Sequence, residues 1–193
     1  MSPRFEAWKR GVNDLPRSES ALEKWLFVGI AGVLFGGKDG ELLRINAAKY
    51  GLCIDGLTAR ISSLSETWGF SLIVVYRCDT YATVVIYNKA RTEKALARVS
   101  EWALNELGYP GDIGAEEFLN EIGRRWQNTG KIPHEIGLAL GYPAKDVLGY
   151  MGLLSSLCTG TCGWRIYGDP APSLRRGRRY VKAKRQAADF LAA

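Results

Sequence analysis

The chain contains a single histidine, His134, which is followed directly by a carboxylate, Glu135. An imidazole beside a carboxylate can exchange protons with a bound molecule, so the pair could act as general acid and base. Pro133 favours the first turn of a helix, which predicts that both side chains lie beside unpaired N–H groups at a helix N-terminus. His134 and Glu135 are therefore the candidate catalytic residues. The alternative is structural: His134 would bind a backbone group while Glu135 caps its helix.

Six further side chains could bind an anion near this pair. Basic side chains attract anions, and Tyr or Trp side chains supply hydrogen bonds and flat apolar surface. The six are Lys38, Arg77, Tyr142, Trp164, Arg165 and Tyr167. We expect them to surround a pocket for a small anionic ligand or cofactor, whose identity the sequence does not indicate.

Residues 32–39 come close to a nucleotide-binding P-loop but lack its chemistry. Large apolar side chains fill the loop, and Asp39 replaces the Ser or Thr hydroxyl that coordinates magnesium. A carboxylate at that place would also repel phosphate. We therefore reject nucleoside triphosphatase activity by this motif, while Lys38 remains a candidate contact for an anion.

The formal net charge of +6 lies in the last 23 residues, which hold seven basic residues and one acid, Asp189. This asymmetry predicts a neutral body with a cationic C-terminal helix. The basic stripe of that helix consists of Arg175, Arg178, Lys182 and Arg185. A narrower, partly apolar stripe consists of Gly177, Val181, Ala188 and Leu191. The basic stripe could bind an anionic partner such as RNA, or it could face solvent while the apolar stripe docks.

Residues 133–154 predict two short helices that meet at an elbow, with Pro143 starting the second helix. The spacing also fits a helix-turn-helix, whose second helix would read DNA bases. The outward positions of that helix are Pro143, Ala144, Lys145, Leu148 and Gly149, with Asp146 beside them. Few of these side chains can read a base edge, and Asp146 would repel phosphate. A structural corner is therefore favoured over DNA recognition.

The four cysteines are too few for the disulfide framework of a small secreted protein. Cys158 and Cys162 are separated by three residues and have no matching second pair, so we predict ordinary buried thiols and no metal site. The apolar residues 25–35 number only 11, against about 20 for a membrane span, and predict a buried helix. With no signal-peptide pattern, we expect a cytoplasmic protein.

Two strand-like runs, Ser71–Arg77 and Tyr81–Tyr87, predict an antiparallel hairpin. Both runs are almost continuously apolar, so helices should cover both faces of the sheet. Helical spacing predicts one helix over residues 92–107, capped by Thr92 and ended by Gly108, and another around 118–126. A further strand is expected at 164–168. The fold class is α+β: a small antiparallel sheet packed with several helices in one domain, 1–170, with a basic helix, 171–193, docked on it.

The segment 133–170 contains the pattern PHEIGLALGYPAKDVLGYMG followed by CGWRIYGDP. It resembles the signature of a bacterial family, domain of unknown function 3793. In that family Pro-His-Glu-Ile-Gly, Leu-Gly-Tyr-Pro and Asp-Val precede a Gly-aromatic-basic-aliphatic-Tyr strand. The resemblance covers most of the chain from about Gly29 onward and implies one fold unit, without supplying an activity.

Three functions are compatible with these residues. The first is the binding of a small anionic ligand or cofactor at the elbow of His134 and Glu135, with or without catalysis. The second is a module that binds nucleic acid or another anionic partner through the basic C-terminal helix. The third is an adaptor that docks a redox or regulatory protein on the same cationic face.

Overall fold

The computed structural model describes residues 2–193 as ten α-helices, a short 3₁₀ helix and five strands, which confirms the α+β class. The helices are α1 (Pro3–Val12), α2 (Arg17–Gly29), α3 (Ala31–Phe35), η1 (Ala48–Tyr50), α4 (Ile54–Trp68), α5 (Lys89–Leu96), α6 (Glu101–Glu106), α7 (Ala115–Thr129), α8 (Ile136–Ala139), α9 (Ala144–Tyr150) and α10 (Ala171–Ala192). The strands are β1 (Gly40–Asn46), β2 (Ser71–Arg77), β3 (Tyr81–Tyr87), β4 (Cys158–Thr161) and β5 (Arg165–Tyr167).

The main sheet has three antiparallel strands in the order β1-β3-β2. The hairpin of β2 and β3 is confirmed with the predicted bounds. Strand β1 was not predicted, and it pairs with the other edge of β3, from Gly40 opposite Tyr87 to Asn46 opposite Tyr81. The strand β3 is therefore central and has a partner on each side.

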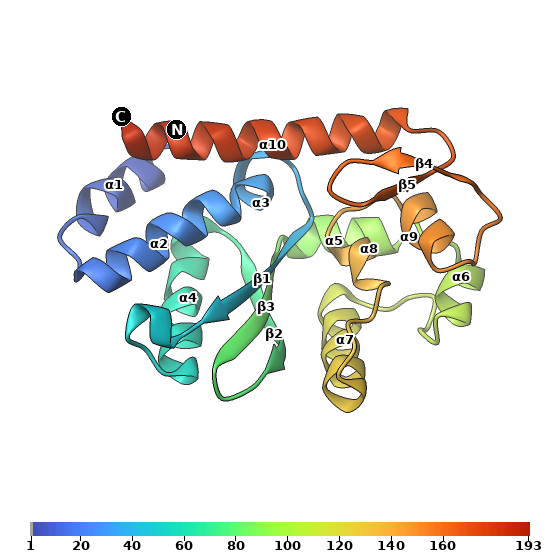
Figure 1. Cartoon of the computed structure of the whole chain (residues 1–193), viewed down its shortest axis with the longest axis horizontal. Coiled ribbons are helices and arrows are strands. Elements are labelled where there is room, and N and C mark those ends of the chain that lie inside the picture. The colour runs from blue at the N-terminus through green and yellow to red at the C-terminus, as the bar shows by residue number, and fades with distance from the viewer. Residues whose placement is uncertain (1) are drawn as a thin grey trace.

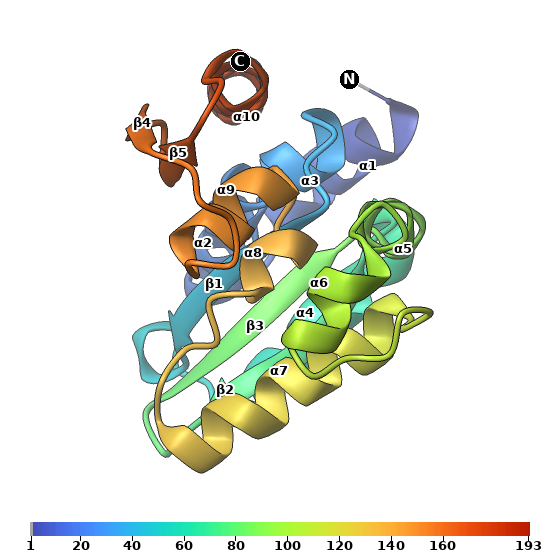
Figure 2. The ribbon, with the colours of Figure 1, turned by 90° about the vertical axis from the view of Figure 1, so that its right-hand side faces the viewer.

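The side chains of β3 alternate between two hydrophobic cores, one on each face of the sheet. Val84 and Ile86 belong to the first core, which also contains buried side chains of α2, α4 and α10. Val85 and Tyr87 belong to the second core, with side chains of α5 to α9. Figures 1 and 2 show α2 and α4 on one side of the strands and α7 on the other. The expectation that helices cover both faces is confirmed.

The apolar stretch 25–35 is largely buried, as expected, but it is not one helix. The chain bends at Ile30, so that the stretch is shared between α2 and α3, and Leu26 and Phe27 are fully buried in the first core. None of the helices within residues 2–193 combines the length and apolar character that crossing a bilayer requires.

The prediction of a single helix over 92–107 is wrong, because the chain forms α5 and α6 with a break between them. The Ser100 hydroxyl accepts a hydrogen bond from the Ala103 N–H at 3.3 Å and so begins α6. The cap of α5 is the Asn88 side chain, whereas the predicted cap, Thr92, is buried within the helix. Gly108 has a φ of 76°, which confirms the left-handed residue at the end of this region.

The helix α7 confirms the prediction around 118–126 and lies directly on β2. A Cβ atom at Gly123 would lie 3.3 Å from the Val75 carbonyl oxygen, so this glycine allows the close approach of helix and strand. Arg125 of the same helix is half-buried, because its side chain meets the segment that leads to α8.

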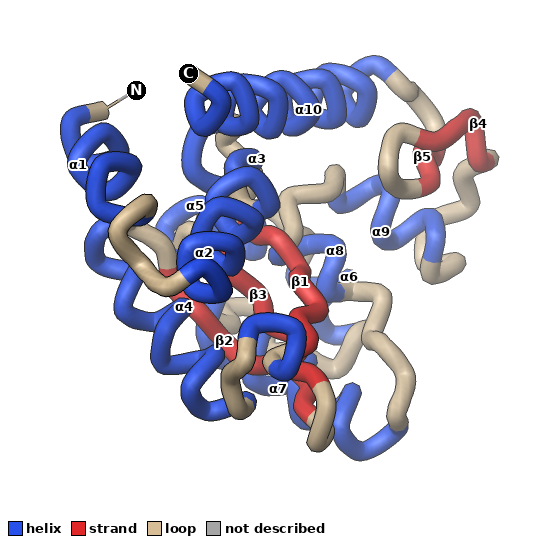
Figure 3. Tube along the Cα trace, turned by 60° about the vertical axis from the view of Figure 1, so that its left-hand side comes forward, coloured by secondary structure: helices blue, strands red, loops and turns tan. Residues whose placement is uncertain are grey.

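The elbow, residues 133–154, differs in detail from its prediction. The helix α8 begins at Ile136, so that His134 and Glu135 lie in the preceding turn rather than inside a helix that starts at Pro133. The strand β5 confirms the prediction at 164–168, whereas its partner β4 was not predicted. The strands β4 and β5 form a second sheet beside the start of α10, apart from the main sheet (Figure 3).

The helix α10 runs along the whole molecule, over the β4–β5 sheet at one end and α2 and α3 at the other (Figure 1). Its buried residues are Ser173, Gly177, Tyr180, Ala183 and Ala187. The predicted apolar stripe is therefore partly wrong: Val181 is 53% exposed and Ala188 is also exposed, while Leu191 is partly buried. The contact is made by small side chains together with Tyr180, Phe190 and Leu191.

Candidate functional site

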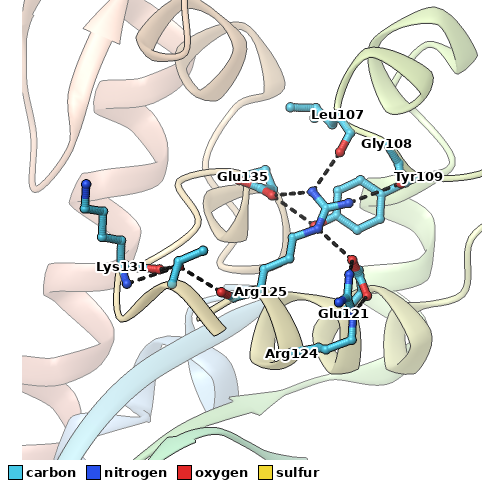
Figure 4. A network of polar contacts seen from close by, with 9 residues as sticks. Leu107, Gly108, Tyr109, Glu121, Arg124, Arg125, Lys131 and Glu135 are labelled. Atoms are coloured by element: carbon cyan, nitrogen blue, oxygen red, sulfur yellow. Dashed lines mark hydrogen bonds and ion pairs between the residues drawn. The ribbon is translucent and has the colours of Figure 1, made fainter. Parts of the chain in front are cut away.

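Glu135 lies at the centre of a buried polar cluster. Its side chain is almost completely buried, and its Oε1 atom accepts hydrogen bonds from the Tyr109 hydroxyl and the Arg125 Nη1, both at 3.0 Å. Arg125 also donates to the Leu107 and Gly108 carbonyl oxygens and lies over the Tyr109 ring (Figure 4). These contacts join α7 to the turn before α8 and the loop after α6.

Glu121 completes this group, which we call the Glu135 cluster: Tyr109, Glu121, Arg124, Arg125 and Glu135. Glu121 accepts hydrogen bonds of 2.7 Å from both Arg124 and Arg125. The bonds from Arg124, and then those from Arg125, lower the pKa of Glu121 to about 2. Burial, with the neighbouring Glu135 carboxylate, raises the pKa of Tyr109. Two carboxylates thus face two guanidinium groups, and the charges of the cluster are balanced.

His134 does not join this cluster. Its side chain is exposed, and its ring packs edge-to-face on Tyr150 with 4.9 Å between the ring centres. Glu135, by contrast, is directed into the protein toward Arg125 (Figure 4). The structure therefore gives the two candidate catalytic residues different surroundings instead of bringing them to one site.

A second buried carboxylate, Asp146, joins the elbow to the small sheet and to α10. It is only 1% exposed and accepts hydrogen bonds from Lys145, Trp164, Ser173 and the Tyr167 N–H. Burial alone would raise its pKa, but these hydrogen bonds lower the pKa below the usual value. The helix-turn-helix interpretation placed Asp146, Leu148 and Gly149 on the outer face of the second helix, but all three are buried. This correction removes most of the surface that could read DNA.

Three of the six predicted ligand-binding side chains lie close together. Tyr142 stacks on Trp164 at 4.5 Å, and the Lys38 Nζ lies 5.8 Å from the Tyr142 ring centre. Lys38 is buried and paired with Glu41 at 2.9 Å, and burial lowers its pKa. These three side chains converge.

The other three lie elsewhere. Arg165 lies over the Tyr150 ring, against which His134 also packs. Tyr167 packs so closely on Gly149 that a Cβ atom there would lie 2.6 Å from the Tyr167 Cγ atom, so a larger residue would displace the Tyr167 ring. Arg77 lies at the end of β2 and pairs with Asp55 of α4. The structure therefore does not assemble all six around one ligand.

A pocket of about 360 Å³ opens between α5, α10 and the elbow. Its lining residues are Gly37, Asp39, Arg91, Lys94, Ala95, Arg98, Leu138, Tyr142, Ala144, Arg176, Arg179 and Tyr180. We call it the basic pocket, because five of these side chains are cationic and only Asp39 is a carboxylate. Tyr142 belongs to both the predicted set and this lining.

Backbone carbonyl groups, rather than carboxylates, hold two of the arginines in the basic pocket. Arg91 donates through Nη2 to the Val33 and Lys38 carbonyl oxygens, at 2.5 and 3.0 Å. Its Nε atom is buried and has no hydrogen-bond partner among residues 2–193. Arg176 donates to the Gly141 carbonyl oxygen at 2.7 Å. Because carbonyl groups carry no net charge, these hydrogen bonds do not neutralise the two arginines, and Asp39 is the single carboxylate of the lining that acts on both charges.

Gly141 shapes the wall of the basic pocket. It has a φ of 81°, and its carbonyl oxygen accepts from Tyr180 as well as Arg176. A Cβ atom there would lie 3.0 Å from the Asp39 backbone nitrogen, so the elbow and the loop before β1 can approach only at a glycine. Burial raises the pKa of Asp39, although four arginines of the pocket act in the opposite direction.

Sequence reasoning missed Arg91, Arg98, Arg176 and Arg179 as site residues. A signal was present, because Arg91, Lys94 and Arg98 recur at helical spacing and so share one face. The predicted stripe on α10 faces another direction: Arg178, Lys182 and Arg185 line a shallow groove with Leu174, Gly177, Val181 and Cys162. The two flanks of one helix therefore carry separate sets of basic side chains.

The cysteines are all present as free thiols. Cys162 is half-buried, and burial raises its pKa, whereas Cys158 is exposed, so the prediction of buried thiols is wrong for Cys158. Across residues 2–193, no three His, Cys, Asp or Glu side chains gather in a way that could hold a metal ion.

The fold and site define an α+β protein with two helical layers around a three-stranded sheet and an arginine-rich pocket. The chain belongs to the family described as "Protein of unknown function (DUF3793)", which matches residues 26–193. This confirms the resemblance read from the elbow pattern, and the matched range includes every residue that lines the basic pocket. No curated protein and no solved structure gave a match.

Proposed function

We propose that this protein binds a small anionic ligand in the basic pocket. The observation that carries the proposal is the excess of cations, with five basic side chains and one carboxylate around about 360 Å³. Guanidinium groups bind phosphate and carboxylate through pairs of parallel hydrogen bonds, so arginines suit such a ligand. The elbow contributes Leu138, Tyr142 and Ala144 to the lining of this pocket. His134 and Glu135 are not among the lining residues.

The test compares two double variants with matched loss of charge. Arg98→Gln with Arg179→Gln removes two cations of the basic pocket, whereas Arg178→Gln with Arg185→Gln removes two from the groove on the other flank of α10. Binding of pyrophosphate, citrate and fructose bisphosphate is measured by thermal shift and calorimetry. We expect at least one to raise the Tm of the wild type.

The pocket variant should weaken that binding about tenfold or more, because each lost charge-assisted hydrogen bond contributes a substantial part of the affinity. The groove variant should bind almost as the wild type does. Absence of binding by all three anions, or equal weakening by both double variants, would contradict the proposal.

A second candidate function is the binding of nucleic acid or another anionic partner along the groove of α10. The supporting observation is that Arg178, Lys182 and Arg185 lie together beside the exposed Val181. Fluorescence anisotropy with a labelled RNA should then show affinity that falls steeply with salt and is lost in the groove variant alone. An adaptor for a redox or regulatory protein would use the same side chains, and the groove variant would then lose a protein partner instead.

A further inference from the structure

The position of Asp39 is fixed by its backbone on two sides. Its carbonyl oxygen accepts a hydrogen bond from the Asn88 N–H at 2.8 Å, and its backbone nitrogen lies against Gly141. Asp39 lines the basic pocket, where it is the single carboxylate. A carboxylate at this position would lower the affinity for an anion that carries no hydrogen-bond donors.

We infer that the basic pocket takes a hydroxyl-bearing bisphosphate, such as a small sugar with two phosphate groups, and that Asp39 selects for its hydroxyl groups. The inference rests on the proposed anion binding and names the class of ligand. A carboxylate accepts strong hydrogen bonds from hydroxyl groups, whereas it repels phosphate oxygens. Asp39 therefore favours a ligand that offers donors next to its charges.

The charge of the pocket supports two phosphate groups. One carboxylate compensates one of the five cations, which leaves four positive charges. A phosphate ester carries about −1.5 to −2 near neutral pH, so two such groups match this excess and one does not. The remaining lining supplies apolar surface for a carbon skeleton, from Ala95, Leu138 and Ala144 and from the rings of Tyr142 and Tyr180.

The experiment compares two probes of similar length and charge. Fructose bisphosphate carries hydroxyl groups between its phosphates, and hexanediol bisphosphate carries none. Calorimetry on the wild type should show about tenfold or stronger preference for fructose bisphosphate, because a site that binds a hydroxyl group discriminates strongly against an analogue lacking it. Fructose monophosphate should bind more weakly than fructose bisphosphate.

The variant Asp39→Asn removes the charge and keeps the shape of the side chain. It should bind hexanediol bisphosphate more tightly than the wild type does, and the ratio of the two dissociation constants should approach one. Asp189→Asn, an exposed carboxylate on α10 outside the pocket lining, is the control for the same change of net charge and should keep the wild-type ratio.

The outcomes separate this inference from the proposed function. If neither bisphosphate nor any other anion binds the wild type, the proposed function fails. If both bisphosphates bind the wild type with equal affinity, the role of Asp39 and the hydroxyl-bearing class are wrong while anion binding stands. This second result needs no variant, so a failure of Asp39→Asn to fold leaves the test intact. An unchanged ratio in a folded Asp39→Asn protein would also overturn the inference.

Discussion

Arginine side chains are the main cations of both the Glu135 cluster and the basic pocket, yet the two regions differ in where the counter-charges lie. In the cluster, Arg124 and Arg125 are paired with Glu121 and Glu135. In the pocket, backbone carbonyl groups hold Arg91 and Arg176. The cluster is electrically complete within the protein. The basic pocket instead has an excess of positive charge. Unpaired charge, rather than the presence of charged residues, therefore marks the region suited to a ligand.

The two regions should also respond in opposite ways to loss of charge. Removing one partner from a buried ion pair leaves the other partner desolvated and without that counter-charge, which lowers the free energy of unfolding. Removing one of several neighbouring cations relieves their mutual repulsion, which favours the folded state in the absence of ligand.

The largest effect is expected for Glu135→Ala. Arg125 and Tyr109 would lose their shared acceptor, and the free energy of unfolding should fall by about 3 to 5 kcal/mol in urea titrations. Glu135→Gln, which keeps an acceptor oxygen, is the milder comparison. A loss below about 1 kcal/mol for the alanine variant would show that the cluster does not depend on this charge.

An intermediate effect is expected for Asp146→Asn, with a loss of about 2 kcal/mol near neutral pH from weaker hydrogen bonds to Lys145, Trp164 and Ser173. Because the folded state lowers the pKa of Asp146, its contribution to stability is present above the usual pKa of an aspartate. The contribution is lost as the pH falls through the lower, folded value.

Unfolding free energies measured from pH 7 down to acid should therefore converge for the wild type and Asp146→Asn. A difference between the two proteins that stays constant down to the lowest pH would contradict the assignment.

The smallest effect is expected for Arg98→Gln, and its sign is reversed. The ligand-free protein should become more stable by up to about 0.5 kcal/mol, since one repelling cation of the basic pocket is gone. Added salt should reduce this gain by screening the repulsion. Lys131→Gln, which removes an exposed cation outside the pocket, serves as the matched control in the same urea titrations. Destabilisation by Arg98→Gln would mean that its charge is compensated within the protein.

The parts of the fold that could be predicted are those with strong local patterns. The β-branched runs of β2 and β3 specify the hairpin, and their apolar character on both faces specifies two covering layers. The strand β1, GELLRIN, is as long as β2 and β3 but carries two charges, so that its pairing with β3 is what makes it a strand. The break at Ser100 depends on a cap that competes with the helical pattern of Leu96 and Leu107.

The basic pocket was harder to predict from the sequence, because its residues come from distant segments of the chain. Tyr142 was expected beside a ligand and does line the basic pocket, but Arg176 reaches it from α10 and Asp39 from the loop before β1. Likewise, nothing local to Glu135 indicates that Arg125 will pair with it across the second core. Spacing along a helix indicates which side chains share a face, but not what that face meets.

The helix α10 has a consequence for how the protein is made. Its Ala183 and Ala187 complete the first core, and Lys9 of α1 donates to the Phe190 carbonyl oxygen at 2.6 Å. A ribosome therefore releases the N-terminal helices long before their covering helix exists, and contacts of such high sequence separation slow folding. Because α10 also supplies Arg176 and Arg179, the lining of the basic pocket is complete only once α10 has docked.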